Sequence, residues 1–78
     1  MKLGFYAIKD ELAGHFMAPT LFMTKGIAER EFRNSLKEIP VWRNNPQDYS
    51  LYKLGEYNEE TGEIEPKIEM IGGGRAYV

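Results

Sequence analysis

The sequence has no cysteine and a single histidine, His15, among its 78 residues. The lack of cysteine excludes disulfides and thiolate metal sites, and one imidazole cannot supply the ligands of a structural zinc site. A domain of this size buries only about 60% of the surface that its unfolded chain exposes, so it is marginally stable without further help. Self-association is the remaining common source of stability, and we therefore predict a homodimer or a higher oligomer.

Long apolar runs and catalytic motifs are also missing. No run approaches the ~20 residues that cross a bilayer, and Lys9 and Asp10 interrupt the first apolar segment before a signal-peptide core could form. There is no Ser-His-Asp pattern in a supporting context, no metal-ligand cluster and no phosphate-binding loop. We predict a soluble intracellular protein that is not an enzyme, with no catalytic residue, cofactor, metal, small-molecule substrate or membrane partner.

The sequence also lacks a large excess of basic over acidic residues. Ten basic and twelve acidic residues give a net charge of −2, whereas proteins that bind DNA without sequence preference are normally basic. Residues 1–44 hold seven basic and five acidic side chains, for a net +2, and residues 45–78 hold three basic and seven acidic ones, for a net −4. This asymmetry permits one mildly basic face in the first half of the chain.

The first third of the chain predicts a strand and an irregular return strand. Lys2–Lys9 is apolar on both parities apart from its ends, which is typical of a central strand covered on two sides. After a turn at residues 10–14, His15–Met23 should return antiparallel to it. Pro19 lies in the middle of that run and cannot donate to a ladder. We therefore predict an edge strand, or a strand broken by a bulge at the proline.

An amphipathic helix is predicted from Lys25 to Ile39. Its apolar residues Ala28, Phe32, Leu36 and Ile39 recur every three or four positions and form one stripe that should pack on the sheet. Thr24 is a suitable N-cap, and Pro40 should end the helix because the residue before a proline avoids the helical region. Residues 41–46 are predicted to form a linker.

The second half of the chain predicts a β-hairpin. Two strand-like runs, 49–57 and 63–71, are joined by a turn in which Gly62 suits a left-handed conformation. Strict alternation would place Tyr49, Leu51 and Tyr57 on one face and Tyr52 on the other. The order β-β-α-β-β predicts an α+β fold, an antiparallel sheet of two hairpins with one amphipathic helix packed on one face. We expect a single domain over residues 1–71 and a flexible Gly-rich tail over 72–78.

Several segments in a fixed order carry a family resemblance. They are the opening strand, the Pro-Thr-Leu-Phe segment at 19–22, the Lys25-Gly26 helix start, the Pro-Gln-Asp-Tyr segment at 46–49 and the Thr61-Gly62 turn. Together they cover most of the chain, which resembles the small nonstructural protein of gokushovirus-type microviruses, phages with circular single-stranded DNA. The resemblance implies a viral protein in the host bacterial cytoplasm that binds single-stranded DNA in phage replication or genome packaging.

Two groups of residues are candidates for nucleic-acid binding. Arg30, Arg33 and Lys37 share a narrow arc of the predicted helix and could contact phosphates; the alternative is a solvated helix face, with Glu29 and Arg33 paired one turn apart. The second group combines aromatic and basic residues, as single-strand binders do: Trp42, Arg43, Tyr52 and Lys53.

The aromatic residues also suit a protein interface, where tyrosine and tryptophan are enriched. Two functions therefore remain open from the sequence. One is a phage accessory protein that binds single-stranded DNA. The other is an interaction module that binds a host or phage protein through an aromatic sheet face.

Overall fold

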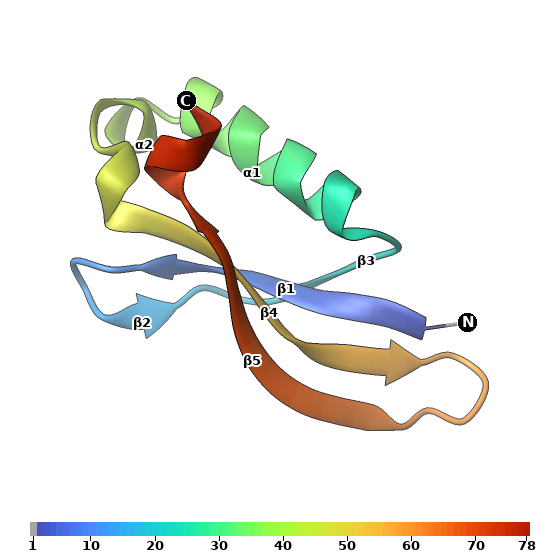
Figure 1. Cartoon of the computed structure of the whole chain (residues 1–78). Coiled ribbons are helices and arrows are strands. Elements are labelled where there is room, and N and C mark those ends of the chain that lie inside the picture. Colours follow the sequence, from blue (N-terminus) through green and yellow to red (C-terminus); the bar gives the residue numbers. More distant parts are fainter. Residues whose placement is uncertain (1) are drawn as a thin grey trace.

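The computed structural model describes residues 2–78 and has the predicted α+β architecture, an antiparallel sheet with one long helix packed on one face (Figure 1). The elements in chain order are β1 (Lys2–Asp10), β2 (His15–Phe16), β3 (Thr20–Phe22), α1 (Lys25–Glu38), α2 (Pro40–Asn44), the 3-10 helix η1 (Pro46–Asp48), β4 (Tyr49–Asn58), β5 (Ile64–Gly73) and the 3-10 helix η2 (Gly74–Tyr77).

The sheet of the described residues has five strands in the order β2-β1-β4-β5, with β3 also paired to β1. The return strand of the first hairpin is broken as predicted, because Pro19 lies in the gap between β2 and β3, which both pair with the same edge of β1. β1 and β4 are the central strands. The outer edges are formed by β2 and β3 on one side and by β5 on the other.

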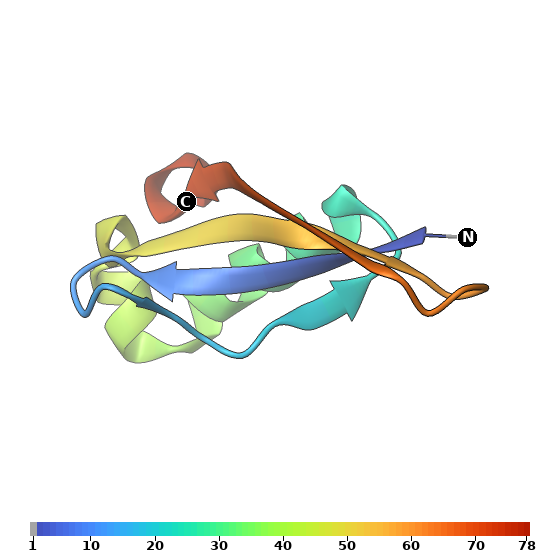
Figure 2. The same cartoon turned by 90° about the horizontal axis from the view of Figure 1, so that it is seen from below.

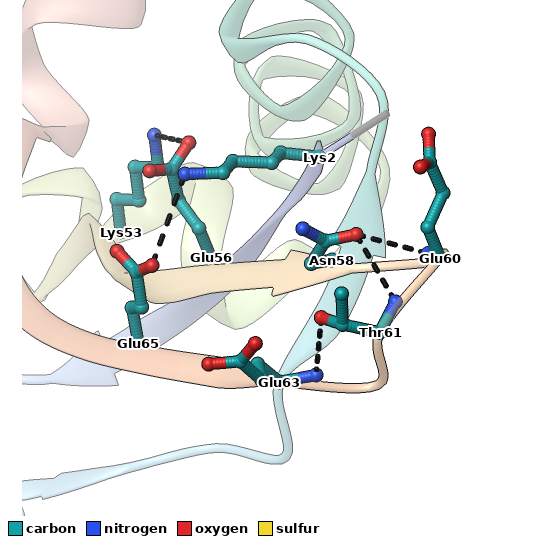
Figure 3. Close-up of polar contacts among 8 residues, drawn as sticks. All are labelled: Lys2, Lys53, Glu56, Asn58, Glu60, Thr61, Glu63 and Glu65. Atoms are coloured by element: carbon teal, nitrogen blue, oxygen red, sulfur yellow. Dashed lines mark hydrogen bonds and ion pairs between the residues drawn. The ribbon is translucent and has the colours of Figure 1, made fainter.

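The hairpin of β4 and β5 is confirmed, and side chains hold its turn. Gly62 has φ +78°. The Asn58 side-chain oxygen accepts from the backbone N–H groups of Glu60 and Thr61, and the Thr61 hydroxyl accepts from the N–H of Glu63 (Figure 3). The pairing register shifts between Lys53 and Gly55. Such irregularities increase the local twist, and the hairpin curves strongly (Figure 1).

Helix α1 begins where the sequence predicts and buries the predicted stripe. The Thr24 hydroxyl accepts from the N–H of Ile27, and Ala28, Phe32 and Leu36 are almost completely buried. They pack with Tyr6, Tyr49 and Leu51 into the core between helix and sheet. Ile39 differs from the prediction: it is extended and 38% exposed, because Pro40 forces it out of the helix before it can join the stripe.

The structure corrects two predictions about irregular segments. The expected linker at 41–46 instead forms most of α2 and the start of η1. The expected flexible tail at 72–78 belongs to the domain, since Gly72 and Gly73 complete β5 and Gly74–Tyr77 form η2. Glycine is needed there by close packing: a Cβ on Gly74 would overlap the carbonyl oxygen of Pro46, and one on Gly72 would press on the ring of Tyr77.

Candidate nucleic-acid interface

Three basic residues of α1 lie together on one side of the helix, and we call Arg30, Arg33 and Lys37 the cationic flank. At 3.6 residues per turn they fall within an arc of about 60°, while Glu31 and Glu38 lie on the other side of the buried stripe. All three basic side chains are exposed. Of the acidic residues of α1, only Glu29 lies on the same side of the buried stripe as the flank.

The cationic flank has no carboxylate partner within residues 2–78. The ion pairs of this part of the chain join Lys2 to Glu65, Lys9 to Glu11 and Lys53 to Glu56, at 3.3–3.8 Å. The pairing of Glu29 with Arg33 that the sequence allowed does not form. Glu29 instead accepts a hydrogen bond of 2.7 Å from the Tyr77 hydroxyl, which leaves the Arg33 guanidinium without a carboxylate.

Tyr77 links η2 to the cationic flank. Its ring packs edge-on against Phe32, with centroids 5.3 Å apart, and the Arg33 guanidinium lies 5.4 Å from the ring centroid. Burial, and then the hydrogen bond to Glu29, raise the pKa of Tyr77 to about 12. The phenol is therefore neutral at physiological pH, so the Arg33 guanidinium lies beside an uncharged ring.

The predicted aromatic residues are dispersed over the molecule. Trp42 of α2 is half-buried and stacks on Tyr49, with ring centroids 4.5 Å apart and planes 20° from parallel. One face of the indole is thus already covered, while the neighbouring Arg43 is exposed. Burial, followed by the charges of Asp10 and Asp48, raises the pKa of Tyr49, so this stack is also uncharged.

Tyr52 and Lys53 lie on opposite faces of the sheet. Lys53 faces the helix side, where its ammonium lies 6.0 Å from the Tyr6 ring and 3.6 Å from a Glu56 oxygen (Figure 3). Tyr52 pairs with Ala7 on the other face and packs edge-on against Phe16, with centroids 5.1 Å apart. The structure therefore gathers Arg30, Arg33 and Lys37 but does not bring Tyr52 and Lys53 into one site.

Sequence reasoning missed the residues of η2. Arg75 is an exposed cation in the 3-10 helix that Tyr77 attaches to α1. Nothing in the sequence indicated that the residues of η2 belong to the folded domain, because three consecutive glycines are typical of a linker. The packing that requires glycine at this point involves residues far away in the chain.

A groove of about 440 Å³ lies between α1 and the first hairpin, lined mainly by apolar side chains such as Tyr6, Met17, Phe22 and Phe32. Among residues 2–78, no three His, Cys, Asp or Glu side chains gather in a way that could hold a metal ion. Within the same range, no helix has both the length and the apolar character needed to cross a membrane.

Comparison with known proteins gives one match. The family described as Phage ORF5 protein is similar to this chain over residues 3–77, which is nearly its whole length. No curated protein and no solved structure matches the chain.

Proposed function

The chain belongs to the Phage ORF5 protein family, and from this premise we propose that it is a non-enzymatic phage accessory protein that binds single-stranded DNA through the cationic flank. The observation that carries the proposal is the exposure of Arg30, Arg33 and Lys37 on one side of α1 with no carboxylate partner within residues 2–78. The resemblance to gokushovirus nonstructural proteins supports the same role, in replication or genome packaging within the host bacterial cytoplasm.

Phosphate is the ligand that suits these side chains. Arg and Lys contact phosphate oxygens without regard to base sequence, and a guanidinium can do so through two parallel hydrogen bonds. From Arg30 to Lys37 the helix rises by roughly 10 Å, which makes the flank an elongated strip. Arg75 of η2 and Arg43 of α2 are further exposed cations on the elements that follow α1 or pack on it.

The negative charge of the chain lies mostly elsewhere. The acidic turn with Glu59 and Glu60 joins β4 to β5 at the opposite end of the molecule from α2 and η2 (Figure 1). Separation by more than one Debye length, about 8–10 Å in physiological salt, screens most of its repulsion. A net charge of −2 is therefore compatible with a local phosphate site, although of modest affinity.

Fluorescence anisotropy with a labelled single-stranded oligonucleotide tests the proposal. Three phosphate contacts on a single strand predict a slope of log K against log salt of roughly −2. The triple variant R30A/R33A/K37A should lose most of the affinity and flatten the slope. Its melting temperature should change little, because exposed charges contribute only about 0–1 kcal/mol each.

A matched control removes the same total charge from other places. The variant K2A/K25A/K67A deletes three exposed cations outside the cationic flank. It should retain nearly all of the affinity at moderate salt, where long-range effects are screened. Equal losses in both triple variants would show that net charge, not the flank, determines binding, and no binding by the unaltered protein would reject the function.

A second candidate function is an interaction module that binds a host or phage protein through the sheet face opposite α1. Exposed apolar side chains on that face, such as Ile64, Ile68 and Met70, favour it. Association through apolar surface would depend little on salt, whereas phosphate binding weakens steeply as salt rises. The salt series therefore separates the two functions.

A further inference from the structure

One face of the sheet is not covered by a helix. In Figure 2, which views the molecule from below, the strands lie in front of α1 and no helix crosses them. Because Tyr6 and Ile8 of β1 point into the core under α1, alternation directs Leu3, Phe5 and Ala7 to the uncovered side. We call this side the open face.

The pairing register identifies the other residues of the open face. Leu21 of β3 pairs with Phe5, Tyr52 pairs with Ala7, and Tyr57 pairs with Leu3. On β5, Met70 pairs with Tyr52 and Ile64 with Tyr57. Ring contacts agree: Phe16 packs against Tyr52, and Phe5 against Tyr57.

Strand β5 alternates in a way that exposes apolar side chains only on the open face. Its even positions 64, 66, 68 and 70 carry Ile, Pro, Ile and Met, and its odd positions 65, 67 and 69 carry Glu, Lys and Glu. The charged residues lie on the helix side, where Glu65 pairs with Lys2 (Figure 3). Ile64, Ile68 and Met70 are 60%, 69% and 54% exposed, which is unusual for neighbours on one strand.

We propose that the open face is the interface of a symmetric homodimer, in which two copies pack sheet against sheet. The partner is a second copy because a twofold axis brings each patch against itself, and a nearly uncharged apolar patch does not repel its own copy. Among the described strand residues, alternation places one charged side chain on the open face, Lys9, and Glu11 neutralises it at 3.3 Å. The cationic flank would repel itself in the same arrangement.

The exposed area matches what a dimer needs. Ile64, Ile68, Met70, Phe16 and Leu21 together expose roughly 500 Å², taking about 200 Å² for a large side chain. The exposed Pro66 extends this patch, as do the partly exposed Leu3, Phe5, Tyr52 and Tyr57. The total approaches the ~800 Å² that each partner contributes to a standard interface, and its aromatic and methionine content is typical of an interface core.

Packing through the face is favoured over pairing along the edge of β5. Pro66 lacks an N–H to donate, and Lys67 and the register shifts in the β4–β5 ladder are features that discourage strand addition. Face-to-face packing of two sheets needs no edge hydrogen bonds. It also leaves both copies of α1 on the outside of the dimer, so that the two cationic flanks remain accessible on opposite sides.

Sedimentation equilibrium over a micromolar concentration range tests this interface. The protein should have twice the 9.0 kDa mass of one chain. The variant I64T/I68T keeps β-branched residues in the strand but should weaken dimerisation by roughly a hundredfold or more, because four isoleucine side chains leave the symmetric interface. Circular dichroism should show that the variant remains folded.

The control M23T/V41T replaces two apolar residues of similar exposure, 57% and 60%, that lie outside the sheet. It should dimerise like the unaltered protein, and so should R30A/R33A/K37A. A monomeric wild-type protein at high micromolar concentration would overturn the proposal. Unchanged dimerisation of folded I64T/I68T would do the same, since the interface would then lie elsewhere.

Discussion

Replacement of Tyr77 tests whether the C-terminal segment is part of the folded domain. Three contacts hold this side chain: the edge-on packing with Phe32, the Arg33 guanidinium over the ring, and the hydrogen bond of 2.7 Å to Glu29. A flexible tail would make none of them. The free energy of unfolding should therefore depend strongly on the residue at position 77.

The expected losses follow from the contacts. Tyr77→Phe removes only the hydrogen bond to the Glu29 carboxylate. Hydrogen bonds to charged groups contribute about 1.5–3 kcal/mol, and we expect about 1.5 kcal/mol here because the pair is partly exposed. Tyr77→Ala also removes the aromatic pair, about 0.5–1.5 kcal/mol, the cation–π contact, about 0.5–1 kcal/mol, and part of the ring burial. We expect a total of about 3–4 kcal/mol, a large part of the ~5–15 kcal/mol that stabilises an ordinary domain.

Urea denaturation at one fixed protein concentration measures both losses, since any dimerisation makes stability depend on concentration. Val78→Ala is the control, because Val78 is the next residue and is 70% exposed. It should change stability by less than about 0.5 kcal/mol. If Tyr77→Ala had as small an effect as Val78→Ala, then η2 would not be packed on α1 and the three contacts of Tyr77 would not contribute to stability.

Three further outcomes are expected. Phe32→Ala should lower the free energy of unfolding by about 3–5 kcal/mol, measured by urea denaturation, because Phe32 is only 1% exposed; a loss below 1 kcal/mol would contradict its place in the core. Gly74→Ala should cost about 1–3 kcal/mol through overpacking, seen as a lower melting temperature, because its Cβ would meet the carbonyl of Pro46; an unchanged melting temperature would contradict that contact. Stability should fall between pH 10 and 12, since Tyr77 holds its proton to a pKa of about 12 when folded but only to 10.0 when unfolded; denaturation across this range should show a smaller fall in Tyr77→Phe, and an equal fall would contradict the assignment.

Sequence patterns were sufficient for the elements whose signals are local. Thr24, the stripe through Ala28, Phe32 and Leu36, and Pro40 define α1 because capping, periodicity and proline geometry each act within a few residues. Pro19 and Gly62 likewise marked the broken strand and the hairpin turn. The three basic residues of the cationic flank follow from the same helical periodicity, so their proximity was predictable too.

The sequence did not predict correctly on which face of the sheet each strand side chain lies. Strict alternation predicted that Tyr52 and Tyr57 lie on opposite faces of the sheet. In the structure both lie on the face that also carries Phe5, because the pairing register shifts between Lys53 and Gly55. A single extra residue reverses the direction of every side chain beyond it. The position of such a slip depends on three strands fitting together, and no local pattern reports it.

The sequence by itself determined the α+β class, the start of α1 and its buried stripe, the two hairpins and the grouping of Arg30, Arg33 and Lys37, because each depends on neighbours within one or two turns. Only the tertiary structure decided that Gly72–Val78 returns to the domain and that Glu29 binds Tyr77 and not Arg33. It also decided which sheet face stays uncovered. The reason is physical: these features depend on contacts between residues far apart in the chain, such as Glu29 and Tyr77, which are 48 positions apart, and the energies of such contacts appear only when the whole chain is packed.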